Sequence, residues 1–132
     1  VGDSSPAEDK SSNEGMVWST PRGGCYMSTP VVCGDYLILG NSNGVVRCFH
    51  AVTGERLYEK RLAANAGIIS SLVVADDRVY CASENGTVYV LAVGPEFKLL
   101  AENKMGQPCF ATPAISDGVI FVRTSEKLVA IQ

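Results

Sequence analysis

The sequence predicts an all-β protein made of β-propeller blades. Its clearest feature is a segment that occurs three times between residues 28 and 131. The copies open at Thr29, Ser71 and Thr112, so the period is 41 to 42 residues. A period of about 40 residues filled with short strands and turn residues is typical of propeller blades.

Two further observations favour blades over a β-sandwich. The apolar runs 37–39 and 119–122 do not alternate with polar residues, which indicates strands that are buried on both faces. Pro30 and Pro113 open the first strand of their copies, and a missing N–H is tolerated only at a sheet edge. The first strand of a blade is such an edge, because it lines the central channel.

Each complete copy is expected to hold four antiparallel strands, A to D. Asp/Gly turns separate strands A and B at 34–35, 76–77 and 117–118. Asn43-Gly44 and Asn85-Gly86 separate strands B and C, and we expect tight type I′ turns there with positive φ angles. The expected spans are 36–40, 78–83 and 119–124 for strand B, 45–50, 87–92 and 127–131 for strand C, and 55–62 and 97–104 for strand D.

The ends of the repeat suggest how the chain is organised. Residues 1–15 are polar and predict a disordered tail or linker, followed by a propeller segment over 16–132. Within it, 16–20 is expected to be strand D of a preceding or closing blade. Blades are expected over 28–62 and 70–104, and a blade without strand D over 111–132. Because ring closure usually takes about 4–8 blades, these blades are expected to be part of a larger propeller, or two chains join to make six.

Composition excludes two classes of partner. The net charge is −3 and the basic residues are scattered, which argues against nucleic acid. No apolar run approaches the roughly 18 residues of a membrane span, and the first 15 residues lack the apolar core of a signal peptide.

The cysteines fit no metal or redox motif. The five are Cys25, Cys33, Cys48, Cys81 and Cys109, and none forms a C-x-x-C pair. Cys48 and Cys81 fall in expected strand interiors, where we predict buried, reduced thiols.

Three motifs that suggest chemistry are better explained as turns, so we predict no catalytic or metal-binding residue. Residues 40–44 match G-x-S-x-G, but that nucleophile motif needs a following helix, and here a strand follows. His50 is the only histidine and has no carboxylate placed near it. Asp76, Asp77 and Asp117 occupy the repeated A–B turn, where Asp caps its own backbone.

Arg123 is the one candidate binding residue. Its counterparts in the other copies are Gly40 and Ala82, so a charge stands where a small residue is otherwise found. Its side chain could face the channel or an axial pocket, or pair with Glu126 or a strand end.

The repeats resemble the PQQ-like propeller family, which includes quinoprotein dehydrogenases and the propeller lipoprotein of the bacterial outer-membrane assembly machinery. The family pattern at the C–D junction is D-x-x-T-G-K/E followed by tryptophan. Here Thr53-Gly54-Glu55 matches it, Ala51-Val52 replaces the acidic start, and Tyr58 stands where tryptophan usually docks. Residues 111–131 look like the last blade of such a protein. Enzymes of the family hold PQQ over a tryptophan beside a calcium ion, and no residue here matches those ligands.

Two functions remain open. We favour a non-catalytic binding or scaffold propeller that presents its loops to a protein or polymer partner. The alternative is a C-terminal fragment of a PQQ-dependent quinoprotein dehydrogenase whose PQQ and calcium lie in blades outside this sequence. A weaker third reading is a chain that self-associates to complete a propeller. The resemblance implies a periplasmic or extracellular protein.

Overall fold

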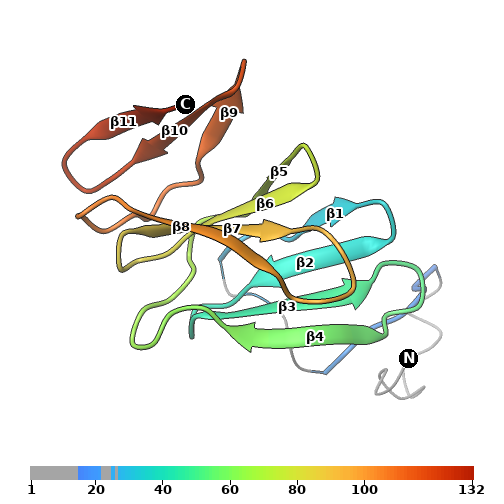
Figure 1. Cartoon of the computed structure of the whole chain (residues 1–132). Coiled ribbons are helices and arrows are strands. Elements are labelled where there is room, and N and C mark those ends of the chain that lie inside the picture. Colours follow the sequence, from blue (N-terminus) through green and yellow to red (C-terminus); the bar gives the residue numbers. More distant parts are fainter. Residues whose placement is uncertain (1–14, 22–24, 26) are drawn as a thin grey trace.

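The computed structural model describes residues 15–21, 25 and 27–132 of the chain. Within these residues, eleven strands form three antiparallel sheets that lie side by side (Figure 1). Neighbouring strands in each sheet are consecutive in sequence, so each sheet is a simple meander. The strands are β1 (Val31–Cys33), β2 (Tyr36–Gly40), β3 (Val45–His50), β4 (Arg56–Arg61), β5 (Val73–Ala75), β6 (Arg78–Ala82), β7 (Thr87–Ala92), β8 (Leu99–Lys104), β9 (Ala114–Ser116), β10 (Val119–Arg123) and β11 (Leu128–Ile131).

These sheets are propeller blades, as the repeat predicts. Blade 1 is β1 to β4, blade 2 is β5 to β8, and blade 3 is β9 to β11. The third copy has three strands here, as expected. Strands β2, β3 and β7 begin and end where the sequence places them, and the other strand ends differ by one or two residues.

In the A–B turns, aspartate residues adopt the left-handed backbone conformation. Asp76, Asp77 and Asp117 have φ angles of 52°, 59° and 50°, and Gly34 and Gly118 have φ angles of 60° and 77°. Asp tolerates this region because its short side chain can hydrogen-bond locally. These three aspartates lie in the A–B turns, where the sequence places them.

The B–C hairpins differ from the predicted type I′ turns. Gly44 has a φ of 86°, but Asn43 is not left-handed. The Gly44 N–H donates to the Asn41 carbonyl at 3.0 Å, and Asn43 Oδ1 accepts from the Val45 N–H at 3.2 Å. This is an ordinary β-turn followed by a left-handed glycine. The prediction was wrong because the Asn side chain caps the chain two residues on, and only the glycine needs positive φ.

The core lies between the blades and is unequal at the two interfaces. The residues that pack blade 1 against blade 2 form a cluster of ten buried side chains. A separate cluster of four, Ala82, Val88, Cys109 and Val122, lies between blades 2 and 3. The larger cluster contains Ile38, Val46, Cys48, Ala63, Ile68, Leu72, Val79, Cys81, Tyr89 and Leu91.

Residues 16–20 form no strand, which corrects one expectation. A strand needs a hydrogen-bonded neighbour, and none of the three sheets includes this segment. Trp18 instead docks on blade 1: its Nε1–H donates to the Ala51 carbonyl at 2.8 Å, and its ring stacks on Phe49 at 5.9 Å. Residues 1–14 lie outside the described residues, so the predicted tail is untested.

The same docking recurs one blade along. Tyr58 of β4 packs edge-on against Phe97, which precedes β8, with ring centroids 5.7 Å apart. Both aromatic side chains therefore contact the C–D turn of the following blade. Trp18 thus docks on blade 1 as Tyr58 docks on blade 2, although residues 16–20 form no strand.

Candidate functional site

The connections between strands gather at two opposite ends of the blades. Because each blade is an antiparallel meander, its B–C hairpin lies at the same end as the loop that leads to the next blade. We call this end the loop face, and it comprises residues 41–44, 62–72, 83–86, 105–113 and 124–127. The opposite end carries the A–B and C–D turns, and we call it the turn face.

Arg123 lies at the loop face. It is the last residue of β10, its side chain is exposed, and it lines a hollow of about 360 Å³ together with Phe110, Ala111, Thr124 and Ser125. Phe110 is 53% exposed. The ion pairs of the described residues do not include one between Arg123 and Glu126. A role of Arg123 at the channel, at an axial pocket or as the partner of a strand end stays a prediction.

The counterparts of Arg123 explain why its charge is exposed. A Cβ added to Gly40 would lie 2.6 Å from Cγ2 of Ile68, on the loop that leads into blade 2. Ala82 is fully buried beside blade 3. At the third copy the Arg123 side chain is exposed, and it lines the same hollow as the Phe110 ring.

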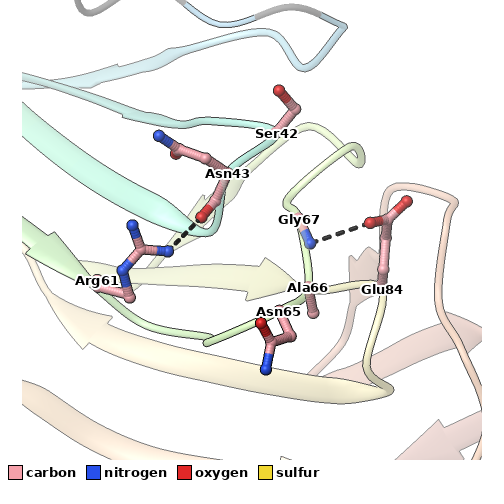
Figure 2. A pocket seen from close by; sticks show the side chains of 7 residues that line it. All are labelled: Ser42, Asn43, Arg61, Asn65, Ala66, Gly67 and Glu84. Carbon is pink, nitrogen blue, oxygen red and sulfur yellow. Dashed lines mark hydrogen bonds between the residues drawn. The ribbon is translucent and has the colours of Figure 1, made fainter.

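A second hollow, also of about 360 Å³, lies between blades 1 and 2 at the loop face (Figure 2). We call it the open notch. Its walls come from the B–C hairpin of blade 1, the end of β4 with the following loop, and the B–C hairpin of blade 2. The lining residues are Ser42, Asn43, Arg61, Asn65, Ala66, Gly67 and Glu84.

The two charged residues of the open notch are held on opposite sides of it. Arg61 donates through Nη1 to the Asn43 carbonyl at 2.6 Å. Glu84 accepts the Gly67 N–H on Oε1 at 3.0 Å. Figure 2 shows the two dashed bonds on either side of the notch. Each bond fixes one end of its side chain and leaves further donor or acceptor atoms for a ligand.

Sequence reasoning missed the open notch. Arg61 and Glu84 belong to different copies of the repeat, and neither is part of a motif. A comparison between copies was the available signal. The counterpart of Arg61 is Lys104, which keeps the charge, and the counterpart of Glu84 is Ser125, which does not.

The remaining sequence candidates are structural. Ser42 lies in a β-hairpin and donates to Asn41 Oδ1 at 3.3 Å, so G-x-S-x-G is a turn here. His50 Nδ1 accepts the Val52 and Thr53 N–H groups at 3.3 and 3.4 Å, which caps the C–D turn. Within the described ranges, no group of three His, Cys, Asp or Glu side chains is arranged to hold a metal. No described helix has the length and apolar character to cross a membrane.

The thiols behave as predicted. All five cysteines are free, and Cys48, Cys81 and Cys109 are buried. Desolvation raises the pKa of Cys48 to about 11 and that of Cys81 to about 12. Such thiols stay protonated at neutral pH and act as small apolar side chains.

Comparison with known proteins decides the family. A family model described as outer membrane protein assembly factor BamB matches residues 10–131. The chain belongs to this BamB-like family of PQQ-like repeat proteins. It is 30% identical over 112 residues to outer membrane protein assembly factor BamB of Burkholderia pseudomallei (strain K96243), covering 83% of this chain and 28% of that protein. It is 25% identical over 127 residues to BamB of Yersinia pestis, covering 86% and 32%. The chain thus spans about a third or less of the curated relatives it matches.

Solved structures agree on the fold. BamB from Moraxella catarrhalis superposes with a TM-score of 0.66 at 16% identity, covering 77% of this chain and 30% of that one. A europium-containing methanol dehydrogenase matches with a TM-score of 0.52 at 15% identity, covering 58% and 15%. The computationally designed protein Ika4 matches with a TM-score of 0.54 at 12% identity, covering 86% and 94%. The predicted PQQ-like propeller is confirmed.

Proposed function

We propose that this chain is a non-catalytic propeller module whose loop face binds a protein partner during outer-membrane protein assembly, in the periplasm. The observation that carries the proposal is its 30% identity to a protein named as an outer membrane protein assembly factor. Two hollows lie at one end of the blades, one with a polar lining and one with a mainly apolar lining beside Arg123, and they support the loop face as the binding end.

Photo-crosslinking in the bacterium that encodes the chain tests the proposal. A photoreactive residue is placed at Asn65 or Ser125 on the loop face, and at Val52 or Glu96 on the turn face. We expect crosslinks to a protein of the outer-membrane assembly machinery from the loop face. Crosslinks to such a protein from the turn face alone would contradict the assignment of the face.

Arg123 is proposed to bind a carboxylate of that partner. A hydrogen bond to a charged group contributes about 1.5–3 kcal/mol, so Arg123→Ala should weaken binding of the crosslinked partner by roughly 10- to 100-fold. Lys127→Ala is the matched control, because it removes a nearby exposed cation outside the hollow. Equal losses in both variants would show a general charge effect and remove Arg123 from the site.

The alternative is a segment of a quinoprotein dehydrogenase. The likeness to a methanol dehydrogenase, at 15% identity, shows the fold alone and does not favour this alternative. We propose that the chain binds neither PQQ nor calcium. Added together, they should leave its melting temperature unchanged, and a saturable rise would favour the dehydrogenase.

Self-association into a six-bladed ring stays a prediction. Light scattering tests it, because a closed pair of chains would have twice the 14.0 kDa mass of one chain.

A further inference from the structure

The open notch has a counterpart between blades 2 and 3, built on the same backbone. At the first interface the Glu84 N–H donates to the Gly67 carbonyl at 2.9 Å. At the second interface the Ser125 N–H donates to the Pro108 carbonyl, also at 2.9 Å. The loop after strand D therefore meets the next blade's hairpin in the same way at both interfaces.

Two more contacts align the loops residue by residue. A Cβ added to Gly44 would lie 2.5 Å from the Ala66 carbonyl oxygen, and one added to Gly86 would lie 2.5 Å from that of Gln107. The residues just before Ala66 and Gln107 are both left-handed, with φ angles of 60° at Asn65 and 82° at Gly106. Ala66 and Gln107 thus occupy equivalent positions.

At the second interface, the Gln107 carboxamide binds the blade 3 hairpin. Its Nε2 donates to Glu126 Oε1 at 3.1 Å, and its Oε1 accepts from Thr124 Oγ1 at 2.6 Å. Both ends of the amide are therefore used, by an acceptor and a donor of the blade 3 hairpin. We call this second site the filled notch.

The open notch lacks that side chain. Ala66 places only a methyl group there, and the hollow remains. Its walls offer an acceptor, the Glu84 carboxylate, and donors, the Arg61 guanidinium and the Asn43 amide. These are not the counterparts of the groups that bind Gln107, because Thr124 and Glu126 correspond to Ser83 and Asn85. The open notch therefore has polar partners of both kinds, from other positions of the repeat, and lacks the amide.

We propose that the open notch binds a carboxamide, the side chain of a glutamine or asparagine on the partner protein. The amide N–H groups would donate to Glu84, and the amide carbonyl would accept from Arg61 or Asn43. This inference rests on the proposed function, since it names what the loop face recognises in its partner.

Charge selects the amide over ionised side chains. A carboxylate in the notch would be attracted by Arg61 but repelled by Glu84, and an ammonium group would be attracted by Glu84 but repelled by Arg61, so for each ionised group the two terms oppose one another. A neutral amide has one acceptor and two donors on one planar group. It satisfies both walls of the notch without repulsion.

A peptide titration followed by NMR tests the proposal on the 132-residue chain. The probe is the blocked tripeptide Gly-Gln-Gly, with Gly-Glu-Gly and Gly-Ala-Gly as matched peptides. We expect Gly-Gln-Gly to shift the Gly67 and Glu84 amide signals saturably, in the millimolar range, and the other two peptides to leave them unchanged. No shift with the glutamine peptide, or the same shift with all three, would overturn the proposal.

The variant Ala66→Gln supplies the amide from within the chain. It should abolish the peptide-induced shifts, whereas Ala66→Ser, which is too short to fill the notch, should retain them. A dispersed spectrum confirms that each variant is folded. Undiminished binding by a folded Ala66→Gln variant would also overturn the inference. If the partner still crosslinks to the loop face in that variant, the proposed function survives and the carboxamide site does not.

Discussion

The two blade interfaces share the same backbone contacts but differ in their side chains at the loop face. Between blades 1 and 2, ten buried residues form the core and the loop-face end is left hollow. Between blades 2 and 3, four buried residues form the core and Gln107 closes the loop-face end with two hydrogen bonds. The interface between blades 1 and 2 has the larger apolar core and no side-chain amide at the loop face. The interface between blades 2 and 3 has the smaller core and is joined there by the hydrogen bonds of Gln107. The two interfaces thus differ at the loop face at one position of the repeat, which holds Ala66 in one and Gln107 in the other.

The largest expected effect tests the inequality of the cores. Ile38 is fully buried in the larger cluster, whereas Ile120 packs half-buried on the smaller one. Ile38→Ala should lower the free energy of unfolding by about 2–5 kcal/mol, and Ile120→Ala by about 2 kcal/mol or less, in urea titrations. Equal losses would mean that the interfaces are equally strong.

Alkaline pH should weaken the interface between blades 1 and 2 more than the one between blades 2 and 3. Two thiols whose pKa is raised by burial, Cys48 and Cys81, lie in the larger cluster, whereas the smaller cluster holds one, Cys109. A thiol buried in its neutral form stabilises the fold below its unfolded pKa of 9.0. That stability falls as pH rises toward 12, because only the unfolded state ionises. We expect a loss of about 1.4 kcal/mol per pH unit for each thiol.

Urea titrations between pH 8 and 10.5 measure this loss. Cys81→Ala should reduce the slope of stability against pH. An unchanged slope would show that alkaline unfolding has another cause.

Emptying the filled notch should have a smaller effect. Gln107→Ala removes two side-chain hydrogen bonds and should cost about 0.5–1.5 kcal/mol for each. Thr124 keeps a bond to the Lys127 carbonyl at 3.2 Å, which limits the loss. Urea titration measures it, and Gln107→Glu tests whether the amide nitrogen matters, since a carboxylate would face Glu126. Equal stability of wild type and both variants would contradict the closure that we assign to Gln107.

The smallest effect concerns the docked tyrosine. The Tyr58 hydroxyl is buried and has no hydrogen-bond partner among the described residues, while its ring packs on Phe97. Tyr58→Phe keeps the ring and removes an unsatisfied polar group, so the melting temperature should stay the same or rise slightly. Tyr58→Ala removes the ring as well and should lower it. A clear loss in Tyr58→Phe would show that the hydroxyl is bonded in solution.

The sequence predicts the blades well because each strand is bounded by residues with local backbone preferences. The bounds of β3 and β7 follow from the glycine before them and the end of the apolar run. Predictions from local backbone preferences were wrong where a side-chain contact determines the conformation. The Asn43 amide caps its own hairpin, and Trp18 docks on blade 1 through its ring while its segment forms no strand.

The candidate site was only partly predictable. Arg123 stands out because its counterparts in the other copies are small, and the structure places it at an exposed strand end. The open notch depends on residues from three segments and on how two blades pack. No spacing rule links Arg61 to Glu84. The sequence difference behind the open notch is that Ala66 stands where the next copy has Gln107. This difference appears only when the two loops, which differ in length, are aligned through their hydrogen bonds.

The crystal structure of the Ala66→Gln variant tests the central comparison most directly. We predict that the introduced side chain lies in the notch, with its nitrogen donating to Glu84 and its oxygen accepting from Arg61 or Asn43. Gln107 likewise uses both ends of its amide, although its partners Glu126 and Thr124 stand at other positions of the repeat. The hollow between blades 1 and 2 should then disappear. An introduced side chain that points into solvent over an unchanged hollow would contradict the equivalence of the two notches.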